Sequence, residues 1–119
     1  MDYREDIKQC YSSIMEQECM IVNMHISLEF TIDIRPLVKT IDALKVMMVY
    51  VWEQHGYGTY KDFFHGKELE TKYLDFIKSP RNLIISESKR YLNTFHVKTM
   101  FDDDLKSLEK MEKLIDSLG

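Results

Sequence analysis

One stretch of the chain, residues 36–55, constrains the fold most, because its apolar side chains would cover nearly every face of a helix. Val46, Met47 and Val49 lie off the main apolar face and extend it around the helix. Such a helix needs neighbours on several sides, so we predict that it forms the buried centre of a bundle. Pro36 suits its first turn, where a missing N–H leaves no hydrogen bond unmade. The main face comprises Leu37, Ile41, Leu44, Met48, Val51, Trp52 and His55.

Three further segments carry the apolar spacing of amphipathic helices. Ser79 and Pro80 follow the second of them and can also cap and start the next helix, so we expect the chain to turn just before Arg81. Residues 81–101 are less regular, and Asp102 to Asp104 suit the start of the last helix. The three segments are 3–28 with Ile7, Ile14, Ile21 and Leu28; 67–78 with Leu69, Tyr73, Phe76 and Ile77; and 105–118 with Leu105, Leu108, Met111, Ile115 and Leu118.

Two connections stand out between these segments. Residues 28–34 alternate apolar and polar side chains as a strand would, but no second strand is available, so we interpret them as an extended connection. Residues 56–66 contain three glycines and several aromatic side chains. Aromatic side chains in such a loop cap the end of a bundle more often than they line a pocket, and both interpretations stay open here.

Composition agrees with a single helical domain. The chain has 119 residues, 45% of them apolar and 30% charged, with four glycines and two prolines. We therefore expect an all-α fold, one bundle of four or five helices over residues 1–119. The longest apolar run, 46–52, falls short of the roughly 20 residues of a membrane span. The acidic N-terminus lacks the features of a signal peptide, so we expect a cytoplasmic protein.

The residues that usually carry chemistry form few patterns. Cys10 and Cys19 would lie about 13.5 Å apart along one helix and on opposite faces, so we expect two buried, reduced thiols. The four histidines show none of the spacings of metal sites, and Asp102, Asp103 and Asp104 are better explained as a helix start than as metal ligands. We expect neither a metal nor another cofactor.

The one candidate site is basic. Residues 78–98 carry a net charge of +4, although the whole chain carries −4. Arg81 and Asn82 open this segment, and Arg90 is followed by His96 after five residues. An arginine can hold a phosphate, and a histidine titrating near neutral pH can move a proton of a ribose hydroxyl.

This segment resembles the signature of the HEPN family of small helical proteins, which is Arg, often followed by Asn, then four to six residues and a His. Arg81 and Asn82 match its start, although Ser86 and Glu87 stand where the histidine is expected. Arg90 and His96 match its spacing, although Tyr91 replaces the favoured Asn. The resemblance implies a homodimer that cleaves RNA without a metal, with Arg90 and His96 catalytic. Arg81, Asn82 and Lys89 would then contact phosphate or RNA.

The leading hypothesis is different, because neither copy of the signature is complete and an acidic protein is a poor general nucleic-acid binder. We expect a cytoplasmic microbial interaction protein without catalytic activity, of the immunity, antitoxin or phage-encoded inhibitor type. Asp102, Asp103 and Asp104 are its predicted contacts with a protein partner, with Glu109, Glu112 and Asp116 as further acidic candidates. A small-ligand binder that uses residues 57–65 beside Trp52 is a third, weaker hypothesis.

Overall fold

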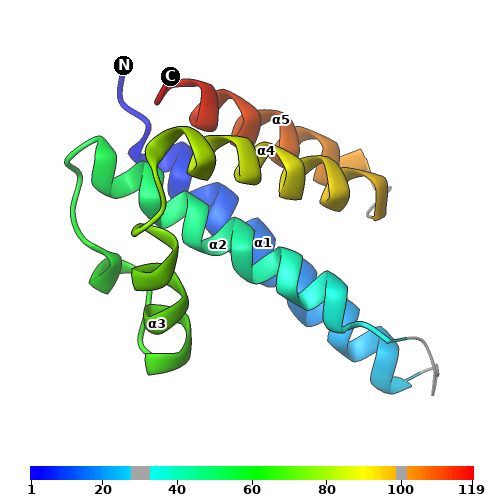
Figure 1. Cartoon of the computed structure of the whole chain (residues 1–119). Helices are drawn as coiled ribbons and strands as arrows, with labels where there is room; N and C mark the ends of the chain where they lie inside the picture. The colour runs from blue at the N-terminus through cyan, green and yellow to red at the C-terminus, as the bar shows by residue number, and fades with distance from the viewer. Residues whose placement is uncertain (28–32, 99–101) are drawn as a thin grey trace.

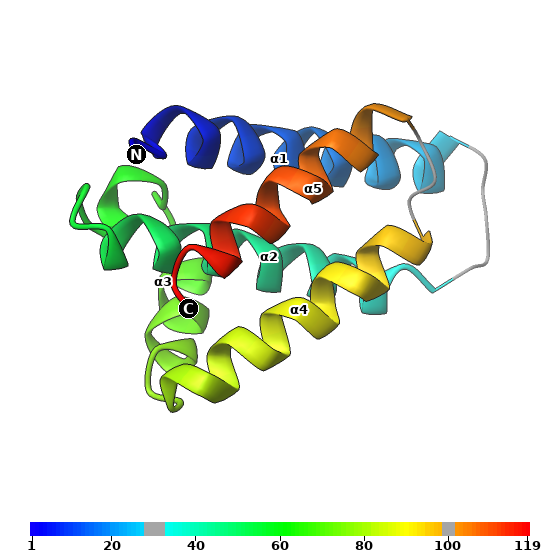
Figure 2. The ribbon, with the colours of Figure 1, turned by 90° about the horizontal axis from the view of Figure 1, so that it is seen from above.

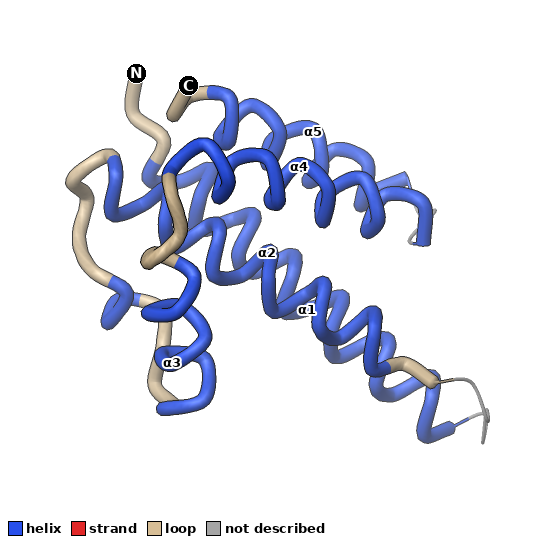
Figure 3. Tube along the Cα trace, in the orientation of Figure 1, coloured by secondary structure: helices blue, strands red, loops and turns tan. Residues whose placement is uncertain are grey.

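The computed structural model describes residues 1–27, 33–98 and 102–119, and of residues 24–27, 97–98 and 102–105 it describes the backbone only. These ranges contain five α-helices, one short 3-10 helix and no strand, which confirms the predicted all-α class (Figures 1 and 3). Residues 28–32 of the predicted extended connection lie outside the described residues. The elements are α1 (Arg4–Ser27), α2 (Arg35–Gln54), η1 (Tyr60–Asp62), α3 (Lys67–Phe76), α4 (Arg81–Lys98) and α5 (Asp102–Asp116).

Helix α2 is the buried centre of the bundle, as predicted. Every residue from 44 to 52 is buried, and the helix contacts α1, α3, α4, α5 and η1. Pro36 lies in its first turn, and Gly56 follows its last residues with a φ of 75°, a left-handed conformation that glycine adopts without strain. None of the described helices is long and apolar enough to cross a membrane.

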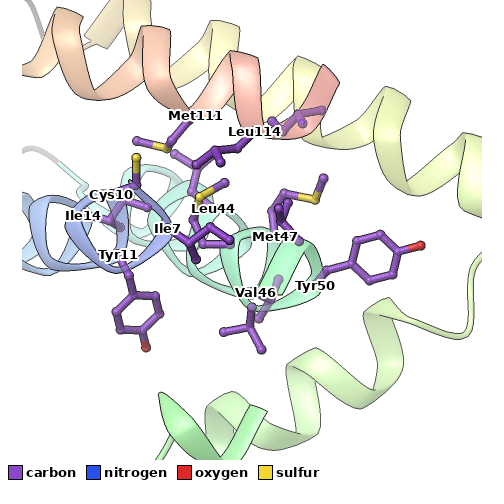
Figure 4. Packing of buried hydrophobic residues seen from close by; sticks show 14 of the residues in the cluster. Ile7, Cys10, Tyr11, Ile14, Leu44, Val46, Met47, Tyr50, Met111 and Leu114 are labelled. Atoms are coloured by element: carbon purple, nitrogen blue, oxygen red, sulfur yellow. The ribbon is translucent and has the colours of Figure 1, made fainter. Parts of the chain in front are cut away.

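The four long helices form two layers. Figure 1 shows α1 beside α2 and α4 beside α5, and Figure 2 shows α5 lying over the space between α1 and α2. Ile7, Cys10 and Ile14 of α1 are buried against the core, to which α5 contributes Met111 and Leu114 (Figure 4). The apolar spacings of the sequence therefore identified the inner faces of α1 and α5 correctly, for the positions that the structure describes.

The loop after α2 closes one end of the bundle. The indole N–H of Trp52 donates a hydrogen bond to Asp62 at 2.9 Å, and the rings of Tyr57 and Phe63 each lie 5.3 Å from the indole, edge-on. The Lys8 ammonium lies 5.3 Å from the centre of the same ring. Because these groups surround Trp52, the aromatic residues cap the bundle end in the way that the sequence favoured.

The structure extends one expectation from the sequence and contradicts another. A helix begins at Arg81, directly after Ser79 and Pro80 as predicted, but α4 continues to Lys98, where less regular structure was expected. Its inner face is formed by Ile84, Ser88, Leu92 and Phe95, and this packing outweighs the weak helix propensity of its serine, threonine and asparagine residues. Cys10 is buried as expected, but Cys19 is exposed, because none of the described elements covers the outer face of α1 at that position.

Candidate functional site

The predicted basic segment lies on α4, and two of its cations are used to hold α5 in place. Arg81 donates a hydrogen bond to the backbone carbonyl of Leu118. Lys89 forms an ion pair of 2.8 Å with Asp116, and this contact raises the pKa of the lysine. Asn82 is exposed in the first turn of the helix. Both cations therefore contribute to the contact between α4 and the C-terminal end of the chain.

Arg90 and His96 do not meet within one chain. Six positions along a helix separate them by about 9 Å in rise and about 120° around the axis. Arg90 instead pairs with Glu87 at 2.8 Å, and its guanidinium lies 5.5 Å from the ring centre of Tyr91. His96 is exposed and lines a small hollow of about 80 Å³ with residues of α4 and α5. A catalytic pair at one phosphate would have to draw on a second copy.

The acidic cluster begins the last helix, as predicted from its sequence. Helix α5 starts at Asp102, and the side chains of Asp102, Asp103 and Asp104 lie outside the described residues. Asp116, which the sequence offered as a further acidic contact, is the partner of Lys89. Across the described part of the chain, no group of three or more His, Cys, Asp or Glu side chains is arranged to hold a metal ion.

The structure shows a surface feature that the sequence did not indicate, a groove where α2, α3 and α4 meet. Its main hollow has a volume of about 410 Å³, and a second hollow of about 200 Å³ adjoins it. Phe76 and Tyr91 line both hollows, so the two form one depression, which we call the α3 groove. The main hollow is lined by Lys39, Asp42, Ala43, Val46, Lys72, Asp75, Phe76 and Tyr91, and the second by Phe76, Ser79, Leu83, Ile84, Glu87 and Tyr91.

The walls of the α3 groove are held by charged side chains that bridge the helices. Lys72 of α3 donates a hydrogen bond of 2.7 Å to Asp42 of α2, and this bond raises the pKa of the lysine. The nearly buried Lys45 pairs with Glu18 of α1 and lies 3.8 Å from Asp42. Glu18, Lys45, Asp42 and Lys72 thus connect α1, α2 and α3 behind the groove.

Glu53 fixes the position of α3 from its other side. Its carboxylate accepts a hydrogen bond from the Tyr73 hydroxyl at 2.7 Å and another from the backbone N–H of Tyr60 at 3.0 Å. Tyr73 is 1% exposed, and burial together with the bond to Glu53 raises the pKa of its hydroxyl. Helix α3 is therefore attached to α2 at both of its flanks, and the groove has a defined shape.

Comparison of the chain with protein-family models, with curated proteins and with solved structures finds no match. The function therefore has to be inferred from the residues and their arrangement alone. The α3 groove draws on residues 39 to 91, from three helices, so no local motif could have indicated it. The sequence feature that comes closest to indicating the groove is the segment from Leu69 to Ile77, which has more apolar side chains than one buried helix face requires.

Proposed function

We propose that this protein is a small helical binding module without catalytic activity, and that it recognises a protein partner through the α3 groove. The observation that carries the proposal is the groove itself, whose exposed surface in the main hollow is largely apolar. Concave apolar surfaces on small proteins are where partner side chains are most often buried. Leu83, which is 50% exposed, lies at the edge of the second hollow and extends this surface.

The pairing of the basic residues supports the same proposal. Arg81, Lys89 and Arg90 each have a partner within the chain, so a phosphate would have to displace a contact already made. Lys89 and Arg90 pair with carboxylates, Asp116 and Glu87, whose charge further weakens an attraction for nucleic acid. A role as an immunity protein, antitoxin or inhibitor fits a module of this kind, and the exposed free thiol of Cys19 suits a reducing compartment.

The experiment that tests the proposal is comparative affinity capture from the cells in which the protein occurs. The wild-type protein is compared with Leu83→Glu, which places a charge in the groove, and with Leu74→Glu as a matched control. Leu74 is 38% exposed on α3 but points about 160° away from Lys72, outside the groove. We expect one partner to be retained by the wild type and the control and lost with Leu83→Glu. Capture that is unaffected by Leu83→Glu would contradict the proposal.

A parallel assay addresses the ribonuclease hypothesis that the HEPN resemblance raises. Purified protein is incubated with RNA of mixed sequence in EDTA, next to Arg90→Ala and His96→Ala. The proposal predicts intact RNA in all three reactions. Cleavage by the wild type that both substitutions abolish would replace the proposal with a metal-independent ribonuclease, and a dimer in solution would then supply the second Arg90 and His96.

A further inference from the structure

Most of the charged side chains that line the α3 groove have a partner of opposite charge. Asp42 and Lys72 pair with each other, Asp75 lies 3.5 Å from Lys78, and Glu87 pairs with Arg90. Lys39 also lines the main hollow, and its ammonium has no ion pair or hydrogen bond within the described residues. The groove therefore presents one uncompensated positive charge at the end of its main hollow.

The shape of the groove suits a helix. Its two hollows meet at Phe76 and Tyr91, and along α4 the lining extends from Leu83 to Tyr91, eight positions or about 12 Å. Side chains one turn apart on a helix have Cβ atoms about 5–6 Å apart, so two of them can enter adjoining hollows. A third side chain on the same face of that helix, two turns from the first, extends the contact to about 10.5 Å. This length is close to the roughly 12 Å over which α4 lines the groove.

We infer that the α3 groove receives an amphipathic helix of the partner protein, an inference that rests on the proposed function. Two apolar side chains of that helix, one turn apart, fill the two hollows on either side of Phe76 and Tyr91. An acidic side chain of the same helix, one turn from the apolar side chain nearer to Lys39, pairs with Lys39. The Tyr91 hydroxyl, which has no hydrogen bond within the described part of the chain, is available to a backbone carbonyl or polar side chain of the same helix.

The sequence pattern of the partner follows from this arrangement: an acidic residue, an apolar residue three or four positions from it, and a second apolar residue one turn further on the same side, in either order along the chain. The apolar contacts supply most of the affinity, because they remove both the groove and the partner side chains from water. The pair with Lys39 lies at the rim, so it adds orientation and a modest preference for a carboxylate.

The test uses synthetic three-turn peptides with blocked ends and NMR titration of the labelled protein up to millimolar peptide. One peptide carries the acidic residue as Glu and a pair of Leu residues one turn apart, and the other has Gln in place of Glu. We expect the Glu peptide to bind about 2- to 5-fold more tightly, as a rim ion pair would give. With Lys39→Gln the two peptides should bind equally, with Leu83→Glu both should be lost, and with Leu74→Glu both should bind as to the wild type.

The peptide titrations would overturn the inference by showing no binding of either peptide at millimolar concentration, a preference for Glu that persists with Lys39→Gln, or equal losses with Leu83→Glu and Leu74→Glu. Octanoate is titrated as a probe for a small ligand. Resonance shifts of groove residues with octanoate but with neither peptide would assign the groove to a small amphipathic carboxylate instead. The capture experiment separates this failure from that of the proposed function. If capture finds a partner that needs Leu83 but the peptides bind without preference for Glu over Gln, only the helix inference is contradicted.

Discussion

The hydroxyl of Tyr73 on α3 donates a hydrogen bond of 2.7 Å to the carboxylate of Glu53 on α2. This contact is nearly closed to water, because Tyr73 is 1% exposed. It also ties the short helix α3, which projects from the bundle in Figure 1, to α2, and three residues of α3 line the main hollow of the α3 groove. The shape of the proposed binding surface therefore depends on a polar contact on the opposite side of α3.

Replacing Tyr73 with Phe should lower the free energy of unfolding by about 1–3 kcal/mol, because the Glu53 carboxylate loses its bond to a buried donor. Urea denaturation followed by circular dichroism measures the change. Tyr60→Phe is the matched control, since its hydroxyl donates a longer bond of 3.2 Å to Glu70, and both residues are only partly buried. We expect less than about 1 kcal/mol for the control, and equal losses would contradict the role given to Glu53.

The Lys45 and Glu18 pair between α2 and α1 makes a second prediction. The Lys45 side chain is 9% exposed and that of Glu18 is 29% exposed. Lys45→Met should destabilise the protein by about 2 kcal/mol, because Glu18 would keep a partly buried charge without its partner. The double variant with Glu18→Met should regain most of that loss. Lys89→Met, which breaks a pair whose side chains are 50% and 53% exposed, should change stability by less than about 1 kcal/mol.

Two glycines of the capping loop should respond differently to alanine. A Cβ at Gly58 would overlap the Asp62 carboxylate and come within 2.7 Å of the Trp52 indole nitrogen, so the bond between these two side chains could not persist. We expect Gly58→Ala to lower the melting temperature clearly and to change the tryptophan fluorescence. A Cβ at Gly66, the N-cap residue of α3, would meet nothing within 4 Å, so Gly66→Ala should lower the melting temperature much less, through the poorer N-cap preference of alanine alone. The reverse order would contradict the packing of the cap.

Stability should fall in alkaline solution. Burial raises the pKa of the Cys10 thiol from 9.0 to about 11, so between these values the unfolded chain releases a proton that the folded chain still holds. The free energy of unfolding then decreases as pH rises, by at most about 1.4 kcal/mol per pH unit for this group. Cys10→Ala should remove that part of the slope, and Cys19→Ala should leave it unchanged. Burial likewise raises the pKa of Tyr11 to about 12, which continues the decrease at higher pH.

Periodic apolar positions were enough to predict α1, α3 and α5, each of which packs one face on the core, and the apolar residues all around α2 predicted its central place. The start of α4 after Ser79 and Pro80 was predicted, but its full length was not, because its buried positions include Ser88. The Ser88 hydroxyl donates to the backbone carbonyl of Ile84 at 2.6 Å, so a polar side chain occupies the inner face without an unmet hydrogen bond. A sequence pattern that counts only apolar residues cannot recognise such a face.

The candidate site was harder to predict than the fold. The sequence drew attention to Arg81, Lys89 and Arg90 as cations, but whether a cation is free depends on what lies opposite it in space. Lys89 and Asp116 are far apart in the chain and become partners only when α4 packs beside α5. Lys39 shows the converse, because nothing in its local sequence distinguishes it from the paired lysines.

The most direct test of the account places a photo-crosslinking amino acid at position 83, in the α3 groove, and in a second variant at position 74, outside it. Both positions are exposed, so neither substitution should disturb the fold. After irradiation in the source cells, we predict a discrete crosslinked protein partner from position 83 and none from position 74. The same products from both positions, or crosslinks from position 83 only to RNA, would contradict the claim that the protein acts by binding a protein partner in the α3 groove.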